Sequence, residues 1–239
     1  MSPWESLIHI WSRTFFSEPF LMISMLAAFW TTLSFHKKER VRLFFIIYII
    51  TGFLLFISTD LALSFKIVTD RSYHIFMEIF NNVFETVELF TFLYFFSKVL
   101  NAVFIDRLFL ILGLIFLLIT WTFYFWIYQF SPPLSVIIDY SYHINVIEMF
   151  FLLMPCLMFF YKIFKDKPSI DLYKRPSFWI AVSLLFYCII IIPFFMLNNT
   201  LFKTYPSFYF ILVALHFITL SILYLSITKA FTCKHLLTI

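Results

Sequence analysis

Seven long apolar runs dominate this sequence and limit what it can fold into. Each run is about 20 residues long, the length of a helix that crosses a ~30 Å hydrocarbon core. Of the 239 residues 63% are apolar and 13% are charged, whereas soluble domains have roughly 45–50% apolar residues. A soluble domain of this size could not bury so much apolar surface. We therefore expect an all-α integral membrane protein, a seven-transmembrane-helix bundle with spans at residues 19–35, 42–64, 73–97, 108–129, 143–163, 177–197 and 207–229.

The Lys and Arg residues predict the orientation of these spans. Cytoplasmic loops of membrane proteins carry an excess of both residue types. If the spans alternate, 13 of the 17 Lys and Arg residues fall on one side of the membrane and four on the other. This bias predicts a multi-pass membrane protein with its N-terminus outside and its C-terminus in the cytoplasm. The net charge of +4 reflects the same bias, so we expect the lipid bilayer and no nucleic acid as a partner.

The rest of the chain leaves little room for further domains. Residues 1–18 have apolar side chains at helical spacing and are expected to form an amphipathic segment on the outer surface, or a frayed tail. The membrane domain then covers residues 19–230, and residues 231–239 form a cytoplasmic tail. The longest loop, Tyr161–Pro176, is too short for a folded domain. We therefore expect any cytoplasmic output to need a second polypeptide.

Polar side chains inside the spans are the main functional signal. Each acidic group at membrane depth costs a few kcal/mol unless it is paired or neutral. Glu78, Glu85 and Glu88 recur at steps that place them on one face of a helix, so we expect that face to lie toward the bundle interior. Together with polar groups of neighbouring spans they would form an outer-half cavity, with His216 nearer mid-membrane. The candidate ligand-pocket or polar-core residues are Asp60, His74, Glu78, Asn81, Asn82, Glu85, Glu88, His143, Asn145, Glu148 and His216.

Three interpretations of this cluster remain open. It could be a hydrogen-bonded core that fixes helix register, with carboxyls partly protonated because they have left water. It could be a ligand or ion pocket open to the outside. It could also be a metal site, whose ligands would be His74, His143, Glu78 and Glu148. No cofactor is predicted, because two Gly residues are too few for the known phosphate-binding loops.

A short sequence repeat contains two of these polar residues, His74 and His143. The hexapeptide Asp70–Ile75 recurs as Asp139–Ile144, 69 residues later, with five of six positions identical. In each copy Asp and Ser are predicted to cap the start of a helix that runs from outside to inside. The recurrence predicts repeated two-helix hairpins, in which spans two and three are related to spans four and five.

Three stretches resemble motifs of a known family. Asn81–Phe90 reads NNVFETVELF, Arg175–Tyr187 reads RPSFWIAVSLLFY, and Ala214–Ile218 reads ALHFI. They resemble a family of small bacterial seven-helix membrane proteins akin to the seven-helix input regions of sensor histidine kinases. The Gly that this family usually has in its sixth span is replaced here, by Ser183 or a nearby Ile. The resemblance implies a multi-pass protein of a bacterial inner membrane with a sensory or signalling role, and it names no ligand.

The expected function follows from these observations. We expect a non-enzymatic sensory or signal-transducing subunit that binds an unknown ligand and acts through a cytoplasmic or membrane signalling protein. No catalytic residue is identified. The alternatives are a transporter of small molecules or ions and a metal-dependent membrane hydrolase.

Overall fold

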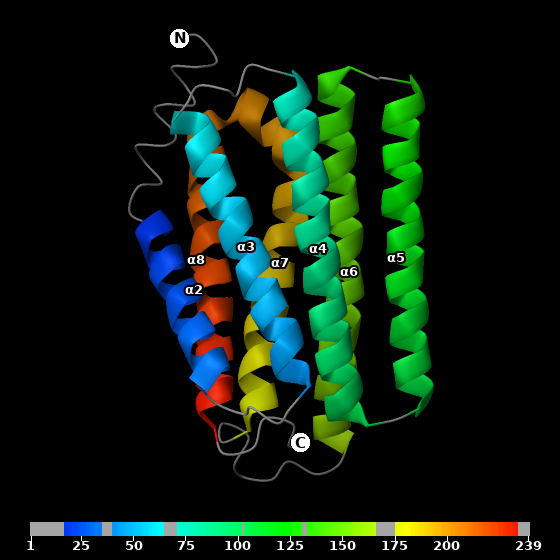
Figure 1. Cartoon of the computed structure of the whole chain (residues 1–239), viewed down its shortest axis with the longest axis vertical. Coiled ribbons are helices and arrows are strands. Elements are labelled where there is room, and N and C mark those ends of the chain that lie inside the picture. Colours follow the sequence, from blue (N-terminus) through cyan, green and yellow to red (C-terminus); the bar gives the residue numbers. More distant parts are fainter. Residues whose placement is uncertain are drawn as a thin grey trace.

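The structure, a computed structural model, is all-helical over the residues that it describes: 17–34, 40–64, 71–101, 103–130, 133–165 and 175–233. Each apolar run predicted from the sequence corresponds to one described helix, and most helices extend past the predicted ends. The predicted amphipathic segment, apart from its last two residues, and most of the C-terminal tail lie outside the described residues. The helices are α2 (Ser17–Ser34), α3 (Val41–Ser64), α4 (Arg71–Leu100), α5 (Val103–Phe130), α6 (Leu134–Lys165), α7 (Pro176–Thr204) and α8 (Pro206–Thr232) (Figure 1).

Five of these helices are long and apolar enough to cross a membrane, namely α3, α5, α6, α7 and α8. The apolar part of α2 is shorter, covering Pro19–Ser34. α4 has 30 residues but interrupts its apolar sequence with Glu78, Glu85 and Glu88. The five apolar helices indicate a helical, multi-pass membrane protein.

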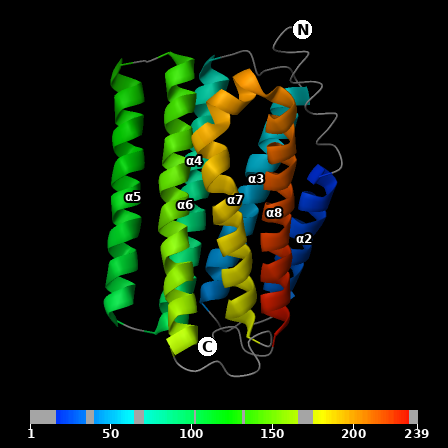
Figure 2. The same ribbon diagram turned by 180° about the vertical axis from the view of Figure 1, so that it is seen from behind.

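Six helices form a closed ring, and α5 lies outside it. Around the ring α2 packs against α3, α3 against α4, α4 against α6, α6 against α7, and α7 against α8, which returns to α2. α5 packs mainly against α4 and makes a smaller contact with α6. Figures 1 and 2 show α5 at one edge of the bundle from both sides. The interior of the molecule is therefore the space that six helices enclose.

Local sequence explains several helix ends. Pro176 and Pro206 open α7 and α8, a position where proline loses no hydrogen bond and already has a helical φ. Asn101 follows α4 with a φ of 48°, the left-handed conformation that Asn and Gly tolerate best. Its N–H donates to the Ser97 carbonyl over 3.0 Å. This bond closes α4 and lets α5 begin two residues later.

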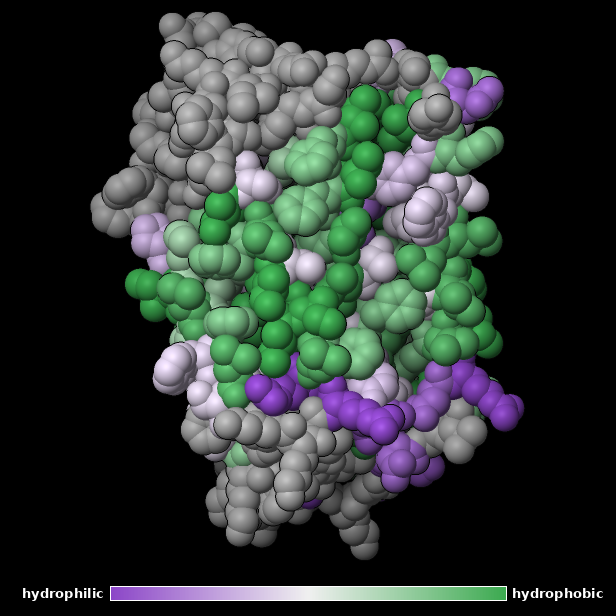
Figure 3. Space-filling model, in the orientation of Figure 1, coloured by the Kyte–Doolittle hydropathy of each residue, from purple (hydrophilic) through white to green (hydrophobic). Residues whose placement is uncertain are grey.

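One end of the bundle carries the described basic side chains, and we call it the basic end. It is the end at which α2, α4, α6 and α8 finish, and Figure 3 shows it as a purple band along one edge of the apolar surface. Arg42 donates to the carbonyls of Thr32 and Leu33 over 2.6 and 2.9 Å. Lys162 donates to the Leu100 carbonyl over 2.8 Å. These cations satisfy free carbonyls at the negative ends of α2 and α4.

Aromatic side chains fill the interior of the six-helix bundle near the basic end. Phe45 of α3 contacts Phe92 and Phe95 of α4 and Phe231 of α8, with ring centroids 5.4–5.7 Å apart. All four side chains are 0% exposed. We call these four residues the aromatic layer. Their edge-to-face geometry is the arrangement that aromatic rings prefer, and it leaves this half of the bundle closely packed.

The predicted cap at Asp139 and Ser141 is wrong. α6 begins at Leu134, so both residues lie inside the helix, and the Ser141 side chain is buried. The start is set by Pro133, whose carbonyl accepts from the Val136 N–H over 3.0 Å, because proline is compatible with a helix start and not with its interior. The first copy of the repeat does coincide with a helix start, since α4 begins at Arg71. The relation between the two hairpins stays a prediction.

Candidate functional site

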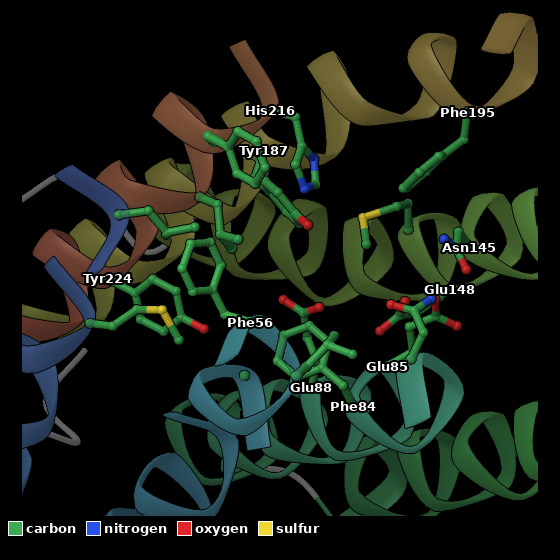
Figure 4. Close-up of a pocket in the computed structure, with 18 of the residues that line it drawn as sticks. Phe56, Phe84, Glu85, Glu88, Asn145, Glu148, Tyr187, Phe195, His216 and Tyr224 are labelled. Carbon is green, nitrogen blue, oxygen red and sulfur yellow. The ribbon is translucent and has the colours of Figure 1, made fainter. Parts of the chain in front are cut away.

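A cavity of about 350 Å³ lies at the centre of the ring. Every ring helix contributes lining residues and α5 contributes none. Gly52, Glu85 and Glu148 line it close to the middle of α3, α4 and α6. The cavity is therefore deeper than the outer half expected from the sequence. Polar lining residues are Asn81, Glu85, Glu88, Asn145, Glu148, Tyr187, His216 and Tyr224 (Figure 4).

Glu88 has a partner that the sequence did not identify. The Tyr48 hydroxyl of α3 donates to Glu88 Oε1 over 3.0 Å, and both side chains are buried. The Tyr48 ring is stacked on Phe84 and on Tyr224, each with centroids 5.5 Å apart. Three ring helices thus hold the Tyr48 hydroxyl in place. On this side of the cavity the side chains are closely packed, and Glu88 is hydrogen-bonded to Tyr48.

The other side of the cavity has polar atoms that lack hydrogen-bond partners among the described residues. It is formed by Glu85, Glu148 and Asn145. Asn81 donates to Glu85 Oε1, while Glu85 Oε2, Asn145 Oδ1 and both oxygens of Glu148 find no hydrogen-bond partner within the described structure. Figure 4 shows the Glu85 and Glu148 carboxyls gathered with the Asn145 amide. Glu148 is 0% exposed. Because buried polar groups are almost always hydrogen-bonded, these atoms indicate a place for water or a ligand.

The described charged groups that line the cavity are all acidic. Three carboxyls line it, and no Lys or Arg is among the lining residues that the structure describes. Glu148 is close enough to Glu85 and Glu88 for their charges to repel. Three bare carboxylates in a desolvated site would be very unfavourable. The site must therefore hold protons, a cation, or both.

His216 of α8 adds a half-buried imidazole to the cavity. Its ring contacts Tyr187 of α7, with centroids 5.9 Å apart, and Phe194 and Phe195, each 6.2 Å away. Its Nδ1 atom is buried, and the described residues offer it no partner. This histidine is therefore available to a ligand or to water in the cavity.

Glu78 and Asn82 lie on the same polar face of α4 but outside the central cavity. Asn82 and Tyr124 donate to the Glu78 carbonyl over 2.7 and 3.0 Å, and the Glu78 carboxyl is hydrogen-bonded to Ser141. Asn82 instead lines a second cavity, of about 700 Å³, between α4 and α5. These contacts hold α5 and α6 against α4. Glu78 and Asn82 therefore have a structural role at the contacts between α4 and its neighbours.

Of the remaining predicted residues, His143 has a described side chain, and it does not line the cavity. His143 is exposed on α6, whereas Glu148 of the same helix is completely buried, so these two candidate metal ligands point to different sides of the helix. The side chains of Asp60 and His74 lie outside the described residues. Among the side chains that are described, no three His, Cys, Asp or Glu residues are grouped to hold a metal ion.

Sequence reasoning missed Tyr48, Tyr187, Tyr224 and Gly52. Tyrosines gather at membrane interfaces, so a tyrosine near the middle of a span was a usable signal for a buried hydrogen bond. Gly52 gave no such signal. A Cβ atom at Gly52 would lie 2.8 Å from the Tyr224 hydroxyl and 2.9 Å from Phe84 Cε2. Its missing side chain lets these two rings approach α3 at the cavity wall.

The cavity combines a hydrogen-bond acceptor set with apolar and aromatic walls. Binding sites for small molecules have this composition and volumes of roughly 300–1,000 Å³. The composition and volume of the cavity therefore support binding of a small molecule. No protein-family model, curated protein or solved structure matches this chain.

Proposed function

We propose that this protein is a sensory or signal-transducing subunit of a bacterial inner membrane. A ligand binds in the central cavity, and the change is passed to a cytoplasmic or membrane partner protein. The observation that carries this proposal is Glu148, a fully buried carboxyl on the cavity wall whose oxygens have no partner among the described residues. A buried group left without a hydrogen bond costs about 1–3 kcal/mol. Binding of a complementary ligand recovers that free energy.

The aromatic layer favours a receptor over a transporter. It lies between the cavity and the basic end, where Phe45 packs on Phe92, Phe95 and Phe231. A transported molecule would need a path through these fully buried rings. A sensed molecule needs access from one side only, and we infer that it enters from the end opposite to the basic end.

The basic end supports the inference of a partner. α4, α6 and α8 carry cavity residues near their middles and finish at this end, so a ligand that shifts these helices moves their ends as well. Lys98, Arg107 and Lys165 are exposed there. Exposed cations of this kind suit an acidic surface on a partner protein.

We further propose that all seven helices cross the bilayer with the N-terminus outside. α4 connects two helices that are apolar enough to span, and its 30 residues give a length of about 45 Å at 1.5 Å per residue. The buried stripe of α4 explains why a crossing helix can carry three Glu residues. Reporter fusions after residues 38, 68, 102, 136 and 170 should alternate, beginning with a cytoplasmic signal. A periplasmic signal from a fusion after residue 239 would contradict this topology.

The function is tested by isolating the protein from native membranes and by reconstituting it alone. We expect a signalling protein to co-purify, and its amount or activity to change with Glu148→Gln. The control is Glu78→Gln, which makes the same chemical change at a carboxyl of α4 that does not line the central cavity. Proteoliposomes containing the protein alone should show no solute flux. Flux without any partner would favour the transporter.

A further inference from the structure

We propose that the central cavity binds a small organic cation, an amine or ammonium group carrying a short alkyl or aryl part. This inference rests on the proposed function only in taking the cavity to be a ligand site. The charge of the cavity gives the first argument. Glu85, Glu88 and Glu148 line it without any described Lys or Arg, so an anion would meet only repulsion. A cation would instead neutralise buried carboxylates that have no other counter-ion.

The unpartnered atoms locate the cationic group. Glu148 Oε1 and Oε2, Glu85 Oε2 and Asn145 Oδ1 are all buried acceptors without a donor in the described part of the chain. Glu148 and Glu85 come from α6 and α4 and lie together in Figure 4. An ammonium group supplies up to three N–H donors and no acceptor. Its donors therefore match these four unpartnered acceptor atoms.

The walls select an organic cation over a bare ion. Phe56, Phe84, Phe195 and Phe217 line the cavity with aliphatic side chains such as Met25 and Leu220. Aromatic faces attract ammonium groups, and they also bury the attached carbon skeleton. Metal ions prefer a complete set of close oxygen or nitrogen ligands. The described residues bring no such set together.

The volume limits the size of the ligand. About 350 Å³ has room for roughly ten water molecules at ~30 Å³ each. This space suits a molecule of around ten non-hydrogen atoms, such as an arylalkylamine. A whole lipid or peptide is larger than this volume. An apolar neutral molecule of the same size would fill the space and leave the carboxyl oxygens without donors, which is costly.

The test uses three probes with the same phenyl group and different charge. The full-length protein in lipid nanodiscs is titrated with 2-phenylethylamine, 2-phenylethanol and phenylacetate, and empty nanodiscs correct for partition into lipid. We expect saturable binding of the amine by calorimetry and a rise in the unfolding midpoint. The alcohol should bind at least tenfold more weakly, and phenylacetate should not bind. Equal binding of the three probes, or binding of none, would overturn the proposal.

Variants connect this selectivity to the carboxyls. Glu148→Gln should weaken amine binding at least tenfold, and Glu85→Gln, which retains an acceptor for Asn81, should weaken it as well. Asp106→Asn on α5 should leave binding unchanged. Wild-type affinity in both glutamine variants would refute the assignment, and the second variant serves if the first does not fold. Amine binding with solute flux and no partner would refute the sensory role alone, whereas a partner without amine selectivity would refute the ligand class alone.

Discussion

Removal of the Tyr48 hydroxyl is the sharpest stability test of the cavity wall. Tyr48 is 0% exposed and donates to the buried Glu88 carboxyl over 3.0 Å. Tyr48→Phe keeps the ring and its stacking on Phe84 and Tyr224 and deletes only the donor. The acceptor then remains buried without it, at a cost of about 1–3 kcal/mol. Taking about 2 kcal/mol, the midpoint of thermal unfolding should fall by about 4–8 °C for a chain of this length.

The assay compares purified proteins in the same detergent by thermal unfolding. Tyr161→Phe is the matched control, because it makes the same chemical change at a side chain that is 68% exposed. We expect that control to change the midpoint by less than about 1 °C, since surface changes are usually small. Equal midpoints for Tyr48→Phe and Tyr161→Phe would refute the proposed role of the hydroxyl.

A double-mutant cycle separates the hydrogen bond from other effects. Tyr48→Phe should cost much less in a Glu88→Leu protein, because the acceptor is already gone. The expected coupling energy is about 0.5–3 kcal/mol. An unchanged cost in that background would show that Tyr48 stabilises the protein by some other contact.

Three further changes test individual features of the fold by the same unfolding assay. Gly52→Ala places a Cβ within 3 Å of the Tyr224 hydroxyl and the Phe84 ring and should cost about 1–3 kcal/mol by overpacking. Gly113→Ala places a Cβ 2.7 Å from Phe90 Cε1 but should cost less, because that ring is only half-buried; the reverse order would contradict the packing described. Asn101→Ala should cost about 1 kcal/mol, because φ is 48° there and alanine avoids that region; Asn101→Gly should be nearly neutral. Lys162→Met loses the 2.8 Å bond to the end of α4 and should cost about 0.5–1.5 kcal/mol, and no loss would exclude a capping role.

The helices and the polar face of α4 were predictable because local physics determines them. Apolar runs of about 20 residues form helices readily, and a helix face that carries Glu85 and Glu88 is more stable inside a bundle than against lipid. The ring order was not predictable, since the amphipathic signal of nearly uniform apolar helices is too weak to choose neighbours. For that reason the sequence did not place α5 outside the ring or predict that Tyr48 would meet Glu88.

The structure differs from the predicted depth of the cavity and from some of its predicted residues for related reasons. His143 was grouped with Glu148 because both begin the predicted span, yet five residues on a helix turn them about 140° apart. Pro133 starts α6 earlier than the apolar pattern does, so Ser141 became part of the helix interior. Asn82 faces α5 and not the cavity, a distinction that requires the position of α5.

Access to the cavity from each side of the membrane tests the central claim most directly. Asn145→Cys would be introduced into a protein whose native Cys156, Cys188 and Cys233 are replaced by serine, and labelled in oriented membrane vesicles with a small, membrane-impermeant thiol reagent. Ser97→Cys, a buried position near the basic end, is the unreactive control. The account predicts labelling of Cys at position 145 from the periplasmic side only. Labelling from both sides would indicate a transport path, and labelling from neither would indicate a closed polar core; either result would contradict a ligand cavity open to the outside.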